Sequence, residues 1–191
     1  LNKEATEILG IPYELEKLVI PATISNVELG QDNQISEIEI KAKTLDAVPK
    51  ISYKTISHCK FVVPESYMED FLKQNNAQIR TGSGNCVASV EDPDVTYTMK
   101  SGIILSNQGD VRRIIADNNT SVTLPDTAAQ INRDAFSKGT GIDTLILPKN
   151  GCAVHLEAGS LNGSNVTSVW CYSREQYDTI KEELSRSGTD R

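Results

Sequence analysis

Apolar and polar residues alternate in short runs along this chain, and the same run returns at regular intervals. The clearest copies lie at residues 122–125, 145–148 and 169–172, and each reads apolar, any residue, apolar, then proline or tyrosine. The second apolar residue stands at position 124, 147 or 171, so the intervals are 23 and 24 residues. Because strand side chains alternate between two faces, each copy predicts a short strand with two core residues and one outward residue. A proline directly after such a strand ends its hydrogen-bond ladder.

Earlier copies extend this pattern into the first half of the chain. Residues 18–21 and 61–64 match it fully, and residues 38–41 match it with Lys41 in place of the proline. Their second apolar residues stand at positions 20, 40 and 63, which gives intervals of 20 and 23 residues. A unit of this length cannot bury its own apolar face and must stack on its neighbours. The repeat therefore predicts a solenoid.

The segments between the predicted strands also resemble one another. The pair Ala135-Phe136 corresponds to Ser160-Leu161, so that a small residue precedes a large one that fills the core opposite the strand. Leu9 lies nine residues before Leu18, the same distance that separates Phe136 from its strand at position 145. This spacing indicates that the sequence begins within a repeat.

Two amphipathic helices are expected where the repeat stops. Ser66 is followed by Glu69, and Ser173 by Gln176, in the Ser-x-x-Glu/Gln pattern of a capping box that opens a helix. Each helix follows an array of repeats, and the exposed end of a stack needs a covering element. Both helices are therefore predicted to be caps.

This pattern divides the chain into three parts. Residues 1–79 are predicted to form a first leucine-rich-repeat array with its capping helix, and residues 80–96, rich in glycine and polar residues, a linker. Residues 97–191 are predicted to contain a hairpin, a second array and a C-terminal capping helix. The hairpin would turn at residues 106–110, between strands at 101–105 and 111–115.

Composition narrows the classes of partner that the chain could bind. The chain of 191 residues has a formal net charge of −7, which argues against nucleic acid as a partner, because phosphate binding needs a basic surface. It also contains no apolar run of about 18 residues, the length that membrane insertion needs. A protein partner remains the simplest expectation.

Candidate chemistry is sparse, and we expect no catalytic residue, no cofactor and no metal. The two histidines, His58 and His155, lie in different arrays. An enzyme with a site near Gly82-Ser83-Gly84 is kept as an alternative. The four cysteines have no CxxC spacing and are expected to be reduced thiols; they are Cys59, Cys86, Cys152 and Cys171.

Residues 131–148 read Ile-x-x-x-Ala-Phe, five further residues, then Ile-x-x-Leu-x-Leu-Pro, and residues 154–171 repeat this motif more loosely. The motif resembles the BspA-like, or Treponema pallidum-type, leucine-rich repeat of surface proteins from bacteria and some protozoa. The resemblance implies an α/β, strand-rich, right-handed leucine-rich-repeat solenoid, here as two short arrays that each end in a capping helix. It also implies export to the cell surface, with any signal or anchor outside this sequence, and adhesion to proteins such as those of the host extracellular matrix. It implies no catalytic motif.

The outward residues of the predicted strands should line up in columns about 5 Å apart. These columns are the candidate partner-binding face: Val19, Glu39 and Val62 in the first array, and Thr123, Ile146 and Trp170 in the second. Exposed apolar residues that end in the only tryptophan of the chain would suit a binding stripe. Trp170 could instead pack beneath the C-terminal helix or against a neighbouring chain. The alternative to an adhesion module is a spacer within a larger surface or phage-tail protein, with its ligand contacts elsewhere.

Overall fold

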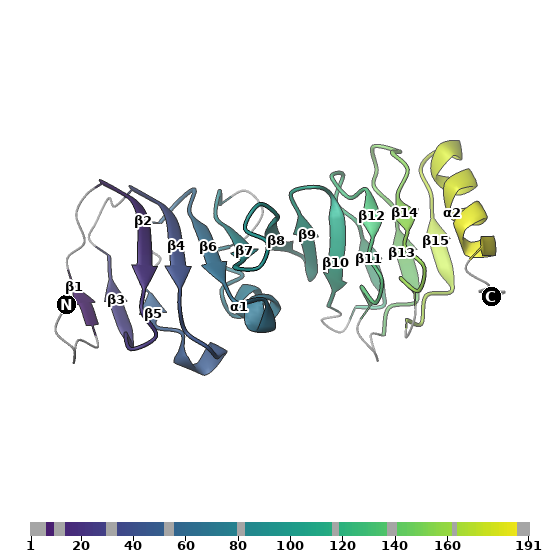
Figure 1. Ribbon diagram of the computed structural model, residues 1–191. Coiled ribbons are helices and arrows are strands. Elements are labelled where there is room, and N and C mark those ends of the chain that lie inside the picture. Colours follow the sequence, from purple (N-terminus) through teal and green to yellow (C-terminus); the bar gives the residue numbers. More distant parts are fainter. Residues whose placement is uncertain are drawn as a thin grey trace. The chain divides into compact units, whose positions relative to one another are not determined.

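Short parallel strands stack into coils in both halves of the chain (Figure 1). The computed structural model describes residues 7–9, 14–29, 34–51, 56–79, 83–115, 119–136, 141–161 and 164–186. The chain divides into two compact units, residues 1–99 and 100–191. Each unit contains a β-solenoid, as the repeat predicts.

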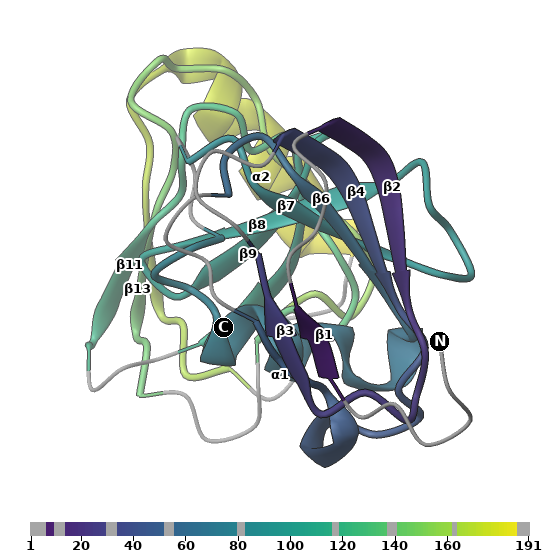
Figure 2. The ribbon, with the colours of Figure 1, turned by 90° about the vertical axis from the view of Figure 1, so that its left-hand side faces the viewer.

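The first unit has strands on two sides of its core, and Figure 2 shows β1 and β3 apart from β2, β4 and β6. One sheet, in the order β1–β3–β5, consists of Glu7–Leu9, Asn26–Glu28 and Lys50–Ile51. The other, in the order β2–β4–β6–β7–β8, consists of Glu14–Ile20, Gln34–Ile40, Lys60–Val63, Cys86–Ser89 and Thr96–Lys100. All pairs are parallel except that of β7 with β8.

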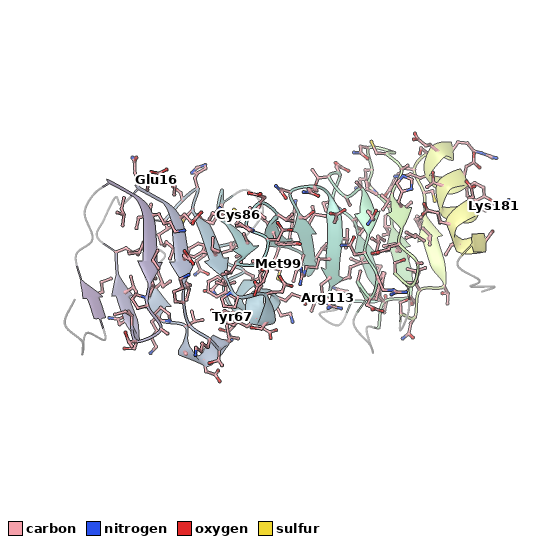
Figure 3. All side chains as sticks on the ribbon, viewed as in Figure 1. Glu16, Tyr67, Cys86, Met99, Arg113 and Lys181 are labelled. Carbon is pink, nitrogen blue, oxygen red and sulfur yellow. The ribbon has the colours of Figure 1, made fainter. Side chains whose placement is uncertain are left out.

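The core of the first unit lies between these two sheets. Ile20 faces Ile40, and Ile38 faces Phe61, in the register of adjacent strands, and all four side chains are fully buried. A 3-10 turn, η2 at Glu65–Tyr67, leads into helix α1 at Met68–Gln74, beside which Tyr67 is labelled in Figure 3. The Phe71 ring of α1 lies 5.9 Å from that of Phe61, so α1 is attached to the core by aromatic packing. A second 3-10 turn, η1 at Leu45–Ala47, precedes β5.

The second unit begins with an antiparallel hairpin, β9 at Ile103–Ser106 and β10 at Asp110–Ile114, which confirms the predicted hairpin. Parallel strands β12 (Gln130–Ile131) and β14 (His155–Leu156) continue from β10. A separate sheet has the order β11–β13–β15, with bounds Ser121–Thr123, Thr144–Ile146 and Ser168–Trp170. Helix α2, Arg174–Arg186, follows β15.

The predicted period is confirmed by the strand register. Val19 pairs with Glu39 and Glu39 with Val62, and Thr123 pairs with Ile146 and Ile146 with Trp170. The segments between these strands were expected to be simple connections. They also form strands, so each coil has two strands. Burial explains this difference, since the connecting segments have apolar residues of their own to place in the core. Among them Ala135 and Phe136 are buried, as predicted.

Only one of the two predicted capping serines caps a helix, and there the Gln176 side chain accepts the N–H of Tyr172 and not that of Ser173. Ser173 Oγ accepts the N–H of Gln176 at 3.0 Å, and α2 begins at Arg174, the residue after Ser173. Ser66 instead lies inside the 3-10 turn η2, and the N-cap of α1, Tyr67, makes no side-chain capping bond. The prediction at Ser66 is wrong because a 3-10 turn, and not an extended residue, leads into α1.

The predicted linker at residues 80–96 also needs correction. Residues 80–82 lie outside the described part of the chain, but β7 within this segment pairs in parallel with β6 and joins the first solenoid. Val87 and Ala88 of β7 are fully buried. The boundary between the compact units lies instead between Met99 and Lys100.

Candidate functional site

The outward side of the sheet β11–β13–β15 contains no charged residue. Its first column is Ser121, Thr144 and Ser168, and its second is Thr123, Ile146 and Trp170. We call these six residues the uncharged face. On a chain in which 24% of residues are charged, a face of this kind is distinctive. The core of a protein interface is likewise depleted of charge and enriched in aromatic residues.

Trp170 is the most exposed large apolar side chain of this face, at 63%. Its neighbour in the column, Ile146, is half-buried, and Thr123 is exposed. The alternative that Trp170 packs beneath α2 is therefore wrong. Ile180 of α2 enters the core of the second unit instead and is only 4% exposed.

Backbone bonds hold the uncharged face rigidly. The N–H groups of Thr167 and Ser168 both donate to the carbonyl of Asp143, at 2.8 and 3.1 Å. The N–H of Leu147 donates to the carbonyl of Trp170 at 3.0 Å. Because these bonds fix β15 on β13, Trp170 is presented from a preformed surface with little ordering cost on binding.

The face of β2, β4 and β6, which carries the predicted column of the first unit, is charged and internally paired. Lys17 lies 2.8 Å from Glu37 and 2.9 Å from Glu39, and Lys60 lies 2.7 Å from Glu37. Lys41 forms a further ion pair with Glu39. Each carboxylate therefore bonds two ammonium groups, and we call these five residues the charge ladder.

The charge ladder shifts the pKa of Lys17, Glu37 and Glu39. Hydrogen bonds to Glu37 and then Glu39 raise the pKa of Lys17 to about 12. Bonds from Lys17 and Lys60 lower the pKa of Glu37, and bonds from Lys41 and Lys17 lower that of Glu39. Each of these three shifts favours the charged form of its residue.

The predicted column of the first unit is only partly a surface. Val19 is 44% exposed, Glu39 is half-buried within the charge ladder, and Val62 is 5% exposed. The expectation that Val62 faces solvent is wrong. It pairs with Glu39 on one side and with Ala88 of β7 on the other, and Ala88 is also fully buried.

The two histidines lie in different compact units of the chain. His155 Nδ1 lies 2.8 Å from Glu183 of α2, and the His58 ring lies against Gly84, where Ser83 Oγ accepts the N–H of Asn85. Gly82 lies outside the described residues. All four cysteines are free, and burial raises the pKa of the Cys59 thiol to about 12. Within the described ranges there is no cluster of His, Cys, Asp and Glu that could hold a metal ion, and no helix long and apolar enough to cross a membrane.

Two buried amide side chains were not singled out as important from the sequence. Asn85 is 3% exposed and Gln176 is fully buried, and each makes three hydrogen bonds to backbone groups of its own unit. The capping-box pattern pointed to Gln176 but not to its tertiary partners. Nothing in the local sequence distinguishes Asn85 from a turn residue.

Comparison with family models, with curated proteins and with solved structures finds no match for the chain. The resemblance to BspA-like repeats therefore remains a prediction, and the solenoid itself is the class of fold observed.

Proposed function

We propose that this chain is a non-enzymatic, extracellular protein-interaction module of the adhesion type, and that its partner binds the uncharged face. The observation that carries the proposal is the 63% exposure of Trp170 at the end of a column of uncharged residues. An exposed tryptophan on an uncharged surface is the kind of residue from which interface hot spots are made.

The finer identity of the repeats belongs to the same proposal. A period of 23 and 24 residues, together with the buried pair Ala135 and Phe136, supports right-handed leucine-rich repeats of the BspA-like kind. That resemblance supplies the cell-surface location and the host extracellular-matrix protein as the class of partner.

The experiment compares binding to immobilised extracellular-matrix proteins for three forms of the chain. Trp170→Ala is expected to weaken binding by about thirtyfold, the effect of losing a hot spot worth roughly 2 kcal/mol. It should leave the melting temperature unchanged, because the indole is mostly in solvent. Val19→Ala is the matched control, since it truncates an exposed apolar residue of the other unit. A Trp170→Ala variant that binds as tightly as the wild type would contradict the proposal.

A spacer role is the second candidate, and the charge ladder favours it for the first unit. Its carboxylates already have two ammonium partners each, so a charged ligand would have to replace bonds that exist. Binding that persists in an isolated second unit with Trp170 intact would assign recognition to that unit and the spacer role to the first.

A further inference from the structure

The acceptor sequence for N-linked glycans, Asn-x-Ser/Thr, occurs four times in the chain, and all four copies lie in the second unit. They begin at Asn118, Asn119, Asn162 and Asn165. Two of them begin just before β11 and two just before β15, the outer strands of the sheet β11–β13–β15 in Figure 1. Asn118 and Asn162 lie outside the described residues.

Burial of the third residue separates the two copies before β15. In the copy that begins at Asn162, the third residue is Ser164, which is 5% exposed. Its hydroxyl donates to the carbonyl of Leu161 at 2.8 Å. In the copy that begins at Asn165, both the asparagine and the third residue, Thr167, are exposed. The structure therefore favours Asn165 as the acceptor before β15.

The local fold holds Asn165 and Thr167 at the surface. Buried and exposed residues alternate here, because Ser164 and Val166 are buried, and Val166 belongs to the core of the second unit. The N–H of Thr167 donates to the carbonyl of Asp143 at 2.8 Å, so this segment is bonded to the previous coil. A bulky group on Asn165 therefore needs no displacement of a core residue.

The position of Asn165 also leaves the uncharged face accessible. Asn165 precedes β15 by three positions, whereas Trp170 is the last residue of that strand. The triplet that begins at Asn119 lies at the same end of the sheet, since the N–H of Asp143 donates to the carbonyl of Thr120 at 2.8 Å, as that of Thr167 does to Asp143. The acceptor end of the sheet and the exposed indole are thus at opposite ends of the strands.

We propose that Asn165 is the acceptor of an N-linked glycan that is added during export. The inference rests on the extracellular location in the proposed function and requires no particular protein partner. The donor is an oligosaccharide carried on a polyprenyl pyrophosphate, which the membrane-bound transferase of a secretory pathway supplies. A bond forms between Asn165 Nδ2 and C1 of the first sugar, and the bond from C1 to the pyrophosphate oxygen breaks. The amide nitrogen gives one proton to the transferase, and the polyprenyl pyrophosphate leaves. A glycan is bulky and hydrophilic, which suits the exposed position of Asn165.

The test secretes the full chain from cultured eukaryotic cells behind a cleavable secretion signal. The purified protein is treated, without denaturant, with peptide N-glycosidase in water enriched in oxygen-18. The enzyme converts a glycosylated asparagine to aspartate and introduces one heavy oxygen atom, so peptide mass spectrometry locates each glycan. We expect the label at position 165 in most molecules. A secreted wild-type chain without label at that position would overturn the proposal, whichever other asparagine is labelled.

Two substitutions at one position show whether the label reports the acceptor sequence. Thr167→Ala removes the hydroxyl and should abolish the label at Asn165, whereas Thr167→Ser keeps the hydroxyl and should retain it. A label that persists in Thr167→Ala contradicts the proposal equally. The wild-type result requires no variant, so it decides the question even where a variant fails to fold.

The outcome is separable from that of the proposed function. A secreted chain without the glycan, whose matrix binding still depends on Trp170, contradicts the glycan alone. A glycosylated chain in which Trp170→Ala binds as tightly as the wild type contradicts the proposed binding face alone.

Discussion

The side-chain carbonyl of Asn85 accepts the backbone N–H of Cys59 at 2.9 Å, across 26 positions of the chain. The amide nitrogen of Asn85 donates to the carbonyls of Ile56 and Gln78, at 3.1 and 3.0 Å. One buried amide thus joins the segment before β6, the segment after α1 and the start of β7. It is the counterpart in the first unit of Gln176 in the second.

Asn85→Ala is expected to destabilise the first unit by about 2–4 kcal/mol. The substitution leaves an N–H and two carbonyls in a buried site without partners. Each such group costs about 1–3 kcal/mol, and relaxation of the surrounding structure recovers part of that cost. Urea unfolding followed by circular dichroism measures the change in the unfolding free energy. Asn76→Ala, at an exposed position, is the control and should stay within about 0.5 kcal/mol of the wild type.

Trp170 fluorescence tests the geometry of the uncharged face directly. The chain has one tryptophan, so its emission has a single source. With 63% of the side chain exposed, the folded protein should emit near the wavelength of the unfolded protein, and acrylamide should quench it almost as efficiently. A blue-shifted, quencher-protected emission in dilute solution would contradict the exposed position.

Acid should weaken the first unit through the charge ladder. The folded pKa values of Glu37 and Glu39 lie below the ordinary 4.5, so their stabilisation is present above that pH and is lost as the pH falls through the lowered values. The urea midpoint should therefore fall more steeply below pH 4.5 in the wild type than in a Glu37→Gln, Glu39→Gln double variant. Glu16→Gln, at an exposed position of β2, is the matched control and should keep the acid sensitivity of the wild type.

Thiol reactivity should follow burial. Cys152 is exposed, whereas Cys59 is fully buried and has a pKa raised to about 12, which keeps it protonated at pH 8. Because the thiolate is the nucleophile, an aromatic disulfide reagent should modify Cys152 first and Cys59 only on unfolding. Cys152→Ser should remove the fast phase of the modification reaction and leave the slow phase that follows unfolding. A fast phase that persists in Cys152→Ser would contradict this assignment.

The repeated apolar–x–apolar run predicted the strand register correctly. Residues that lie one repeat apart in the sequence pair in adjacent strands. Ile20 pairs with Ile40, 20 positions later, and Ile146 pairs with Trp170, 24 positions later. The prediction succeeds because each coil is held by contacts to the next coil at a fixed sequence distance, so local pattern and tertiary structure carry the same period. The hairpin at β9 and β10 was also predictable, because its turn residues are local signals.

Other features required the assembled fold. The Ser66 motif is locally as good as that at Ser173, yet only Ser173 makes a side-chain cap at the start of its helix. Val62 is buried, and its partner Ala88 belongs to β7, a strand in a segment that reads as a linker. These outcomes depend on partners more than 20 residues away, which no local pattern encodes.

The sequence by itself determined the coil period, the core positions and the column in which Trp170 stands, because each depends on alternation within a strand and repetition between strands. Only the tertiary structure decided that the column in the second unit ends in an exposed Trp170, while that in the first is ion-paired and partly covered. It also decided that Glu183 and Gln176 of α2 bond to backbone groups of the last coil. The reason is physical: exposure and tertiary hydrogen bonding are set by what packs on a surface, and that is a property of the folded chain.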